Sequence, residues 1–569
     1  MISGASIVRK AMDGIKRNVL LFGLLVFAFG LRIWGTKIGL PTADLVGDET
    51  FSVSYLLRIF ASGNPFTQTV NPYPVMLSVL HAPFVVSHLA ILWIANGFHS
   101  AGELQTYLLV HGVNALLFWP RFVSVCAGTA TIYLLYRILE LAFSRRPAFF
   151  GALAATVNVL AVSISHWGRA HAVLSFYIAG AAYAALLCQT RNEKKYFYWS
   201  VAAAACACST HYLGVSSLIF PFIALLSIKP FWRSAGKAAA LFIAIVVPAY
   251  VINLTGIINM IRGTYQNYYL PNQFAGLYPI GRFERFYYIV ADLFALDPVG
   301  VVVGGIGILL LLIRRRFTRP VVTLLVGLGF LYAVQVAMVA ARHETRWLLP
   351  FDLFLLGVGV ASVADALVRD AARFVRWKIA FLVLLLLPGC VITIKWLSLL
   401  GTHTQVQVEQ WMIAHRTEPM FLYTESLNPT PTPEAASWNA AHSPRLQLSA
   451  KNAYVIAHPQ DFSEIGISYY HATDLPDGDH CPILRDLGIR YVILSYTVPE
   501  ERERQKSHII SCISEPSLVR YTPGPDALQR RPFENLVNSI VSAKYIFSSS
   551  AIGPWYEILS VSEPISHRP

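Results

Sequence analysis

The stretch NVLLFGLLVFAFGLRIWG, residues 18–35, decides the class of fold that we expect. About 20 consecutive apolar residues suffice to cross the hydrocarbon core of a bilayer, and this run contains a single charge, Arg32. Basic residues precede it, and no small-residue cleavage site follows it. We therefore expect this segment to remain in the chain as a first membrane span, with the basic N-terminus in the cytoplasm.

Composition extends this expectation to most of the chain. Of its 569 residues, 55% are hydrophobic and 14% are charged, against about 25% charged residues in soluble proteins. We predict a polytopic α-helical transmembrane domain over residues 1–399 and a soluble extracytoplasmic α/β domain over residues 400–569. The membrane domain should have about eleven spans, at 18–36, 121–141, 148–166, 172–190, 197–211, 213–228, 237–258, 298–313, 320–341, 348–368 and 378–398.

The distribution of charge sets the orientation of these spans. After residue 399 the chain has 13 Lys and Arg against 18 Asp and Glu, which argues against nucleic-acid binding by the soluble part. The basic residues concentrate in alternate short loops, as the positive-inside rule requires of cytoplasmic loops. These loops are 145–146, 191–195, 229–237, 314–319 and 369–378. We expect a multi-pass protein of the inner (plasma) membrane whose N-terminus is cytoplasmic and whose C-terminal domain is extracytoplasmic.

One apolar stretch, residues 74–97, does not fit the alternation of charge. It is long enough to span, but counting it as a span would invert every later loop. We interpret it as a helix lying in the outer interface, or as half of a re-entrant pair. A twelfth span is the alternative.

The C-terminal part shows mixed helix and strand patterns. Residues 405–416 favour a helix; residues 421–426, 453–459 and 490–496 favour buried strands, and 428–437 favours a surface loop. Cys481 and Cys512 are the only cysteines of this part, so an extracytoplasmic location predicts a disulfide between them. A zinc site would need more thiols than these two.

An acidic pair, Asp48 and Glu49, follows the first span on the outer side. Ionisable groups beside hydrocarbon are costly and tend to be functional. A carboxylate here could act as general base on an acceptor hydroxyl or amine, and its neighbour could orient the acceptor or hold a divalent cation. The alternative is a solvated cap at the N-terminus of a helix.

Basic residues gather at the same outer face. Guanidinium groups bind phosphate bidentately, which makes these residues candidates for a phosphate site; the alternative is ordinary charge flanking a span. The candidates are Arg169, Arg342, His343 and Arg346.

Polar and aromatic residues in the outer turns are typical of sugar sites, although interfacial Tyr also anchors spans in the membrane. They are His171, His211, Tyr212 and Tyr265. Because nucleotide sugars and ATP are absent outside the cytoplasm, a group activated there is normally carried on a lipid phosphate. The acidic pair, the phosphate-binding cations and their shared outer location together therefore indicate a lipid-phosphate donor.

Several motifs resemble the GT-C glycosyltransferases, in particular the branch of protein O-mannosyltransferases and the lipid A aminoarabinose transferase. They are the acidic pair, GNPF with NPYPV (63–75), RFVSVCAGTATIYLLYRI (121–138), SHWGRAHAVLSFYI (165–178), RHETRWLLPFDLFLL (342–356) and GPWYEILSV (553–561).

The resemblance implies transfer of a sugar from a polyprenyl phosphate to an acceptor at the extracytoplasmic face, with inversion. It implies that Asp48 is the catalytic acidic residue, which acts as the base, that Glu49 is its companion, and that Arg346 lies near the donor phosphate. His171 departs from the family pattern, because many relatives have Asp there. This leaves open both a divalent cation and the class of acceptor, whether lipid, glycan or protein.

Two other functions compete with the transferase. A transporter or flippase is the main alternative, although the chain shows no inverted repeat and no charge pairs at mid-membrane in the expected spans. The other is a catalytically silent scaffold on the same fold.

Overall fold

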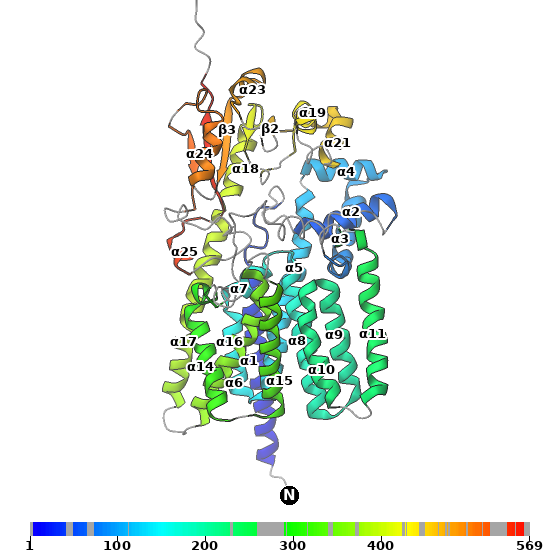
Figure 1. Ribbon diagram of the computed structural model, residues 1–569, viewed down its shortest axis with the longest axis vertical. Coiled ribbons are helices and arrows are strands. Elements are labelled where there is room, and N and C mark those ends of the chain that lie inside the picture. The colour runs from blue at the N-terminus through cyan, green and yellow to red at the C-terminus, as the bar shows by residue number, and fades with distance from the viewer. Residues whose placement is uncertain are drawn as a thin grey trace, which may run out of the picture.

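The computed structural model describes most of the chain. The described residues are 4–40, 49–64, 73–111, 113–227, 231–255, 257–258, 290–291, 293–315, 317–338, 345–369, 375–423, 427, 430–442, 450–464, 466–472, 475, 478–496, 499–514, 516–523, 543–551 and 553–562. Within them, roughly aligned helices form a bundle, and the strands lie above one end of it (Figure 1). The first helix emerges from the opposite end of the bundle (Figure 1).

The bundle is mostly helical and strongly apolar. Its helices are α1 (Gly4–Ile33), α5 (Phe118–Ala142), α6 (Arg145–Thr156), α7 (Val159–Ser165), α8 (Ala170–Arg191), α9 (Lys194–Thr210), α10 (Ile219–Leu226), α11 (Phe231–Val251), α14 (Pro298–Ile313), α15 (Arg319–Met338), α16 (Leu349–Arg369) and α17 (Val375–Leu399). Short 3₁₀ segments precede α5, α10 and α16 and follow α17; they are η2 (Val113–Leu117), η3 (Tyr212–Leu218), η5 (Thr345–Leu348) and η6 (Leu400–Thr402).

Six helices among the described residues are long and apolar enough to cross a membrane, or up to seven if one bent pair counts as a span. Shorter apolar helices include Val19–Ile33, Tyr212–Leu226, Pro298–Ile313 and Arg319–Val334. The predicted spans therefore coincide with helices, while their number, about eleven, stays a prediction.

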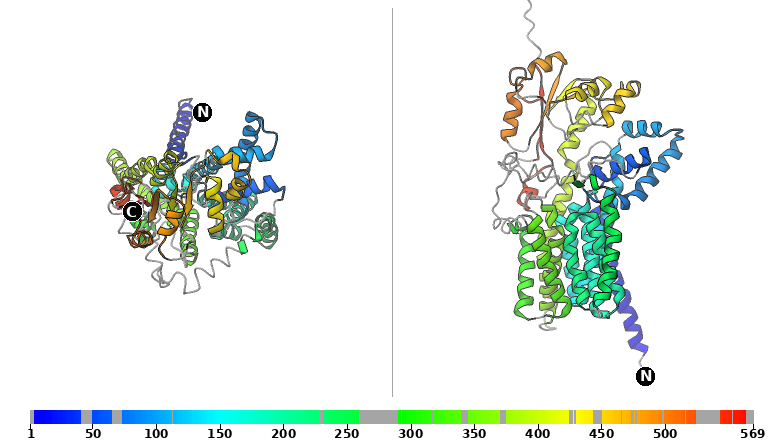
Figure 2. Two further views of the ribbon diagram at one scale, coloured as in Figure 1. Left: turned by 90° about the horizontal axis from the view of Figure 1, so that it is seen from above. Right: turned by 45° about the vertical axis from the view of Figure 1, so that its right-hand side comes forward.

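The stretch 74–97 forms α3 (Met76–Asn96), which is one of the six apolar helices. Together with α2 (Thr50–Ser62) and α4 (Ala101–His111) it lies beyond the ends of α8, α9 and α10, on the side of the strands (Figure 1 and Figure 2). Several of its apolar side chains are exposed, including Val79, Ile91 and Ile94. Since α3 is also long and apolar enough to cross a membrane, its location in the outer interface stays a prediction.

The predicted span 148–166 is broken into α6 and α7, which meet at an angle of 58°. Side chains from two other helices and one side chain at the break itself bind the backbone there. Thr393 donates to the carbonyl of Val157 at 2.7 Å, and Arg32 donates to that of Thr156 at 3.5 Å. The Asn158 side chain accepts from the backbone N–H of Ala161 at 2.8 Å and donates to Asp352. The break is stable because these groups replace the hydrogen bonds that a continuous helix would make.

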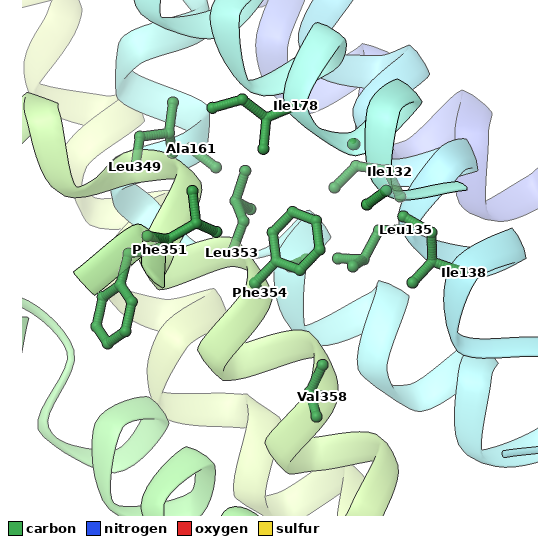
Figure 3. Close-up of a cluster of buried hydrophobic side chains, with 14 of the residues drawn as sticks. Ile132, Leu135, Ile138, Ala161, Ile178, Leu349, Phe351, Leu353, Phe354 and Val358 are labelled. Atoms are coloured by element: carbon green, nitrogen blue, oxygen red, sulfur yellow. The ribbon is translucent and has the colours of Figure 1, made fainter. Parts of the chain in front are cut away.

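Helix α16 lies at the centre of the bundle, in contact with α6 and α14. Leu353, Phe354 and Val358 of α16 point toward Leu135 of α5 and Ile178 of α8 (Figure 3). On its other side, glycines let α16 approach α14 closely. A Cβ added at Gly359 would lie 2.3 Å from the Cα of Gly304, so the two backbones are in direct contact.

The C-terminal part contains a five-stranded sheet of order β2-β1-β3-β5-β4. The strands are β1 (Met420–Leu422), β2 (Tyr469–His471), β3 (Tyr491–Tyr496), β4 (Val519–Tyr521) and β5 (Trp555–Ser560). The first three are parallel, while β5 pairs antiparallel with β3 and β4. Around them lie α18 (Thr404–Ala414), α19 (Pro433–His442), α21 (Ala450–Ala457), α22 (Pro459–Phe462), α23 (Cys481–Asp486), α24 (Pro499–Ser507) and α25 (Ala543–Ser548).

Two local predictions for this part were wrong. Residues 453–459, expected as a strand, lie mostly in helix α21 and then begin α22. A short apolar run does not distinguish a strand from a helix by periodicity, and here Asn452 and Val455 are buried on one helical face. The expected loop 428–437 becomes helix α19 from Pro433, because proline is well tolerated in the first turn of a helix.

The parallel strands end on the side that faces the bundle. Tyr496, the last residue of β3, pairs with Trp555, the first residue of β5. Just before Trp555, the carbonyl of Pro554 accepts from the hydroxyl of Thr404 at 2.7 Å, where the chain has just left α17. Since β1 and β2 run parallel to β3, all three strands point their carboxyl ends toward the bundle.

A disulfide and a hydrogen bond hold the C-terminal part together and to its surroundings. Cys481 and Cys512 are bonded, with Cα atoms 5.7 Å apart. At the other side, the Tyr454 hydroxyl of α21 contacts Thr106 and donates to the carbonyl of Gly102, both of α4. The C-terminal part therefore contacts α4 through α21, in addition to its covalent continuation from α17.

Candidate active site

Glu49 precedes α2 and is completely buried. Its Oε2 lies 2.8 Å from Nη2 of Arg121, and its Oε1 lies 3.0 Å from Nε of the same guanidinium. Oε1 also accepts from the backbone N–H of Gly168 at 2.5 Å. Both oxygens are thus occupied, and they join the start of α2 to α5 and to the turn before α8.

Arg121 contacts further groups besides this carboxylate. Its Nη1 donates to the carbonyls of Thr36 and Ile38 at 2.9 and 2.7 Å. Its guanidinium lies 5.2 Å from the ring of Trp167. One buried cation thereby fixes three separate chain segments, the end of the first span, the start of α2 and the 167–168 turn.

Three residues predicted to bind sugar or acceptor lie together. The rings of His171, at the start of α8, and His211, at the end of α9, are 5.0 Å apart. The ring of Tyr212 is 4.0 Å from that of His211, and the ring of Tyr73 is 5.2 Å from it. We call His171, His211, Tyr212, Tyr73 and Trp347 the ring cluster; the Trp347 ring is 6.1 Å from Tyr212.

The ring cluster lies next to the buried ion pair. Phe51, two residues after Glu49, has its ring 6.3 Å from Tyr73. Gly168, which donates to Glu49, precedes His171 by three residues. Glu49 and the ring cluster are therefore parts of one region at the end of the bundle nearest the sheet.

Two predicted phosphate-binding residues flank the ring cluster. Arg169 forms the N-terminal boundary of α8, and Arg346 precedes Trp347 in η5. Both are buried, with 3% and 5% of their surface exposed. Two cationic side chains held beside aromatic and imidazole rings suit an anionic ligand with an attached polar group.

The remaining predicted residues of the site, Asp48, Arg342, His343 and Tyr265, lie outside the described residues. Their placement stays a prediction. Within the described ranges, no group of three or more His, Cys, Asp and Glu side chains could hold a metal ion. Glu49 does not fit a metal ligand, because Arg121 and Gly168 already occupy its oxygens.

Sequence reasoning missed Arg121, Tyr73 and Trp347 as members of this region. Arg121 stands at the start of a predicted span, where a charge is expected from membrane anchoring alone. Tyr73 is held by the segment that follows α11, because its carbonyl accepts from the Asn253 side chain at 2.8 Å. Nothing in the local pattern around residue 73 predicts a partner 180 residues away.

Comparison with known proteins gives one family match. Residues 104–254 match the model of the dolichyl-phosphate-mannose-protein mannosyltransferases. Over these residues the match confirms the resemblance to GT-C glycosyltransferases that the sequence motifs predict. No curated protein matches the chain.

Several solved structures are similar to this chain at TM-scores below 0.5. ArnT from Cupriavidus metallidurans bound to undecaprenyl phosphate is 12% identical, with 96% of this chain and 98% of that chain covered and a TM-score of 0.47. The Archaeoglobus fulgidus oligosaccharyltransferase complex with zinc and sulfate is 14% identical, covering 83% and 67%, at 0.41. The Pmt1–Pmt2 complex of S. cerevisiae bound to its sugar donor is 20% identical, covering 43% and 34%, at 0.30.

Proposed function

We propose that this chain, whose residues 104–254 match the mannosyltransferase family, is a membrane glycosyltransferase. It moves a sugar from a polyprenyl-phosphate carrier to an acceptor at the extracytoplasmic face. The observation that carries the proposal is that three groups lie together at one end of the bundle. They are Glu49, which is next to Asp48 in the chain, the buried arginines Arg169 and Arg346, and the ring cluster.

The proposed topology has about eleven spans within residues 1–399, a cytoplasmic N-terminus and an extracytoplasmic domain over residues 400–569. It is supported by the basic residues of alternate loops and by the position of the sheet at the end of the bundle opposite the start of α1 (Figure 1). The disulfide Cys481–Cys512 suits an oxidising compartment outside the cytoplasm.

The proposed reaction is a single displacement at the anomeric carbon. Asp48 takes the proton of the acceptor hydroxyl or amine. The acceptor atom forms a bond to the anomeric carbon while the bond from that carbon to the phosphate oxygen breaks, which inverts the centre. The electron pair leaves with the polyprenyl phosphate, and Arg346, Arg169, Arg342 and His343 stabilise its charge.

Within this mechanism Glu49 is a positioning residue. Its carboxylate is committed to Arg121 and Gly168, so it holds the chain next to Asp48 in place. We propose that His171, His211, Tyr212 and Tyr265 contact the sugar or the acceptor.

The test is transfer of label from a radiolabelled polyprenyl-phosphate sugar in membranes that contain the full chain. Asp48→Asn should reduce the rate by at least about 10²-fold, the usual contribution of a general base. Glu103→Gln, at the exposed start of α4, is the matched control and should keep the wild-type rate. Normal transfer by Asp48→Asn would remove Asp48 from the mechanism.

The same membranes distinguish the transferase from a transporter or flippase. A transferase leaves the label covalently attached to a new acceptor. If the label crosses the membrane while remaining on its original carrier, transport is the function and the proposal is wrong.

A further inference from the structure

Helix α3 carries two buried polar atoms that have no hydrogen-bond partner in the described part of the chain. They are Oγ of Ser78 and Nε2 of His81. Both side chains are buried, with 1% and 0% of their surface exposed. Because they are three residues apart, they lie on the same face of the helix. Native proteins rarely leave such atoms without a partner, so two of them on one helix face indicate a polar ligand.

The two side chains can both donate and accept hydrogen bonds. The hydroxyl of Ser78 has one donor and two acceptor positions. In His81, Nδ1 lies 2.8 Å from the hydroxyl of Ser52. A neutral imidazole carries its proton on Nε2 if Nδ1 accepts from Ser52, and leaves Nε2 as an acceptor if Nδ1 donates. In either tautomer, Ser78 can supply the group that complements Nε2.

The partner of His81 places this face of α3 close to the acidic pair. Ser52 lies in the first turn of α2, and Glu49 is the residue that caps the start of this helix. His81 is therefore hydrogen-bonded to a residue within one helical turn of Glu49. In the proposed reaction, Asp48 takes the proton of the acceptor at this position of the chain, so both substrates must come together nearby.

Helix α3 also packs against the start of α8, which contributes to the ring cluster. Leu77, which precedes Ser78, packs against Ala170 of α8, and Ala170 is followed by His171. Both ring nitrogens of His171 are likewise buried without a hydrogen-bond partner among the residues that the structure describes. The unpartnered atoms of α3 and α8 therefore belong to neighbouring residues of one contact between helices.

We infer that Ser78 and His81 form a hydroxyl-binding subsite, which holds a hydroxyl of the donor sugar or of the acceptor beside the acidic pair. A hydroxyl both donates and accepts, so it matches the two side chains in either tautomer of His81. The inference rests on the proposed function. It adds to the site a helix, α3, that holds none of the residues predicted from sequence.

Two substitutions at His81 separate a ligand-binding role from a structural one. Asn carries its amide at the position of Nδ1, so His81→Asn keeps a hydrogen bond with Ser52 but leaves no polar atom at the position of Nε2. Gln carries its amide at the position of Nε2, so His81→Gln keeps a polar atom there and loses the bond to Ser52. A ligand at Nε2 makes Gln the better substitute, whereas a purely structural histidine makes Asn the better one.

The ranking is measured by transfer of label from a radiolabelled polyprenyl-phosphate sugar in membranes that contain the full chain. His81→Asn and Ser78→Ala should each reduce the rate roughly tenfold, as expected for the loss of one hydrogen bond to a substrate. His81→Gln should stay within about threefold of wild type. This order of the two His81 variants is the result that a structural role does not produce.

The same helix provides matched controls. Nδ1 of His88 accepts from the indole N–H of Trp119 at 2.7 Å, a bond that an Asn side chain can also make. Ser87 is exposed. His88→Asn and Ser87→Ala should both transfer label at the wild-type rate.

Binding of the labelled donor lipid to the full chain in nanodiscs distinguishes the two sources of the hydroxyl. If His81→Asn and Ser78→Ala bind this lipid more weakly than wild type, the hydroxyl belongs to the donor sugar. If they bind it equally well while transfer falls, the hydroxyl belongs to the acceptor. In both cases polyprenyl phosphate without sugar should bind the variants and the wild type alike.

The outcomes separate the inference from the function on which it rests. Wild-type transfer by both His81→Asn and Ser78→Ala overturns the inference and leaves the glycosyltransferase standing. Faster transfer by His81→Asn than by His81→Gln overturns it as well, because the bond to Ser52 would then be the one that matters. If the wild type itself transfers no label, the proposed function fails together with the inference.

Discussion

The carboxylate of Glu49 and the guanidinium of Arg121 form an ion pair with no exposed surface on either side chain, although the two residues are 72 positions apart. The pair joins the first helix after the first span to α5. It also receives the backbone N–H of Gly168, so three parts of the bundle depend on one carboxylate.

Glu49→Gln should destabilise the protein by about 3–5 kcal/mol, because removing one partner of a buried pair leaves the other charge uncompensated. Thermal unfolding in detergent would measure it. The matched control is Glu193→Gln at the exposed pair with Lys195, whose side chains are 41% and 60% exposed and whose loss should cost under about 1 kcal/mol. Equal melting temperatures for the two variants would contradict a structural role for Glu49.

Gly359→Ala should separate α16 from α14. The added Cβ would lie 2.3 Å from the Cα of Gly304, and overpacking of this kind costs about 1–3 kcal/mol. Gly305→Ala on α14 is the control, because a Cβ there meets nothing within 4 Å and alanine favours a helix by about 1 kcal/mol. In thermal unfolding, the melting temperature of Gly359→Ala should lie below that of wild type, and that of Gly305→Ala should lie above it.

The sheet should lose stability in acid through Glu557. Burial alone would raise the pKa of Glu557, but hydrogen bonds from Arg502 and Arg520 and nearby positive charges lower it to about 2. The folded pKa lies below the unfolded value of about 4.3. Ionised Glu557 therefore contributes fully to the free energy of unfolding above the unfolded pKa, and this contribution disappears as the pH falls toward the folded pKa. It amounts to about 3 kcal/mol.

Unfolding of wild type and Glu557→Gln across this range checks the prediction. The difference in unfolding free energy should be largest at neutral pH and should shrink progressively below about pH 4.3. A difference that stays constant down to about pH 2 would exclude the linkage.

Reduction of Cys481–Cys512 should destabilise the C-terminal part. The bond closes a loop with a sequence separation of 31, for which chain entropy predicts about 3–4 kcal/mol. A reductant should lower the melting temperature of the wild type. It should have no effect on the Cys481→Ser, Cys512→Ser double variant, whose melting temperature should already be low.

Much of the helical framework could be predicted from sequence, because long apolar runs and basic loops report directly on a bilayer. The break between α6 and α7 could not, because it depends on Arg32 of α1 and Thr393 of α17, which are far away in the sequence. The prediction of a strand at residues 453–459 was wrong for a different reason, because a short apolar run suits a strand or a helix equally well.

Only some residues of the candidate site were named from sequence, and the contacts between them were not predicted. His171, His211 and Tyr212 were named from their polar and aromatic character, and they lie together. The ion pair of Glu49 and the contact of Tyr73 with His211 join segments far apart in the chain. Such pairings are decided by tertiary packing, which a single sequence does not encode in any local pattern.

The direction of the parallel strands determines which sequence changes affect the surface near the bundle and which affect the strand pairing of the sheet. The carboxyl ends of β1, β2 and β3 lie on the side facing the bundle, whereas the strand pairs are set by backbone hydrogen bonds. Side chains at strand ends can vary at little cost to the backbone pairing. Changes at these strand ends would therefore alter the surface nearest the bundle without altering the helices that hold the arginines and rings.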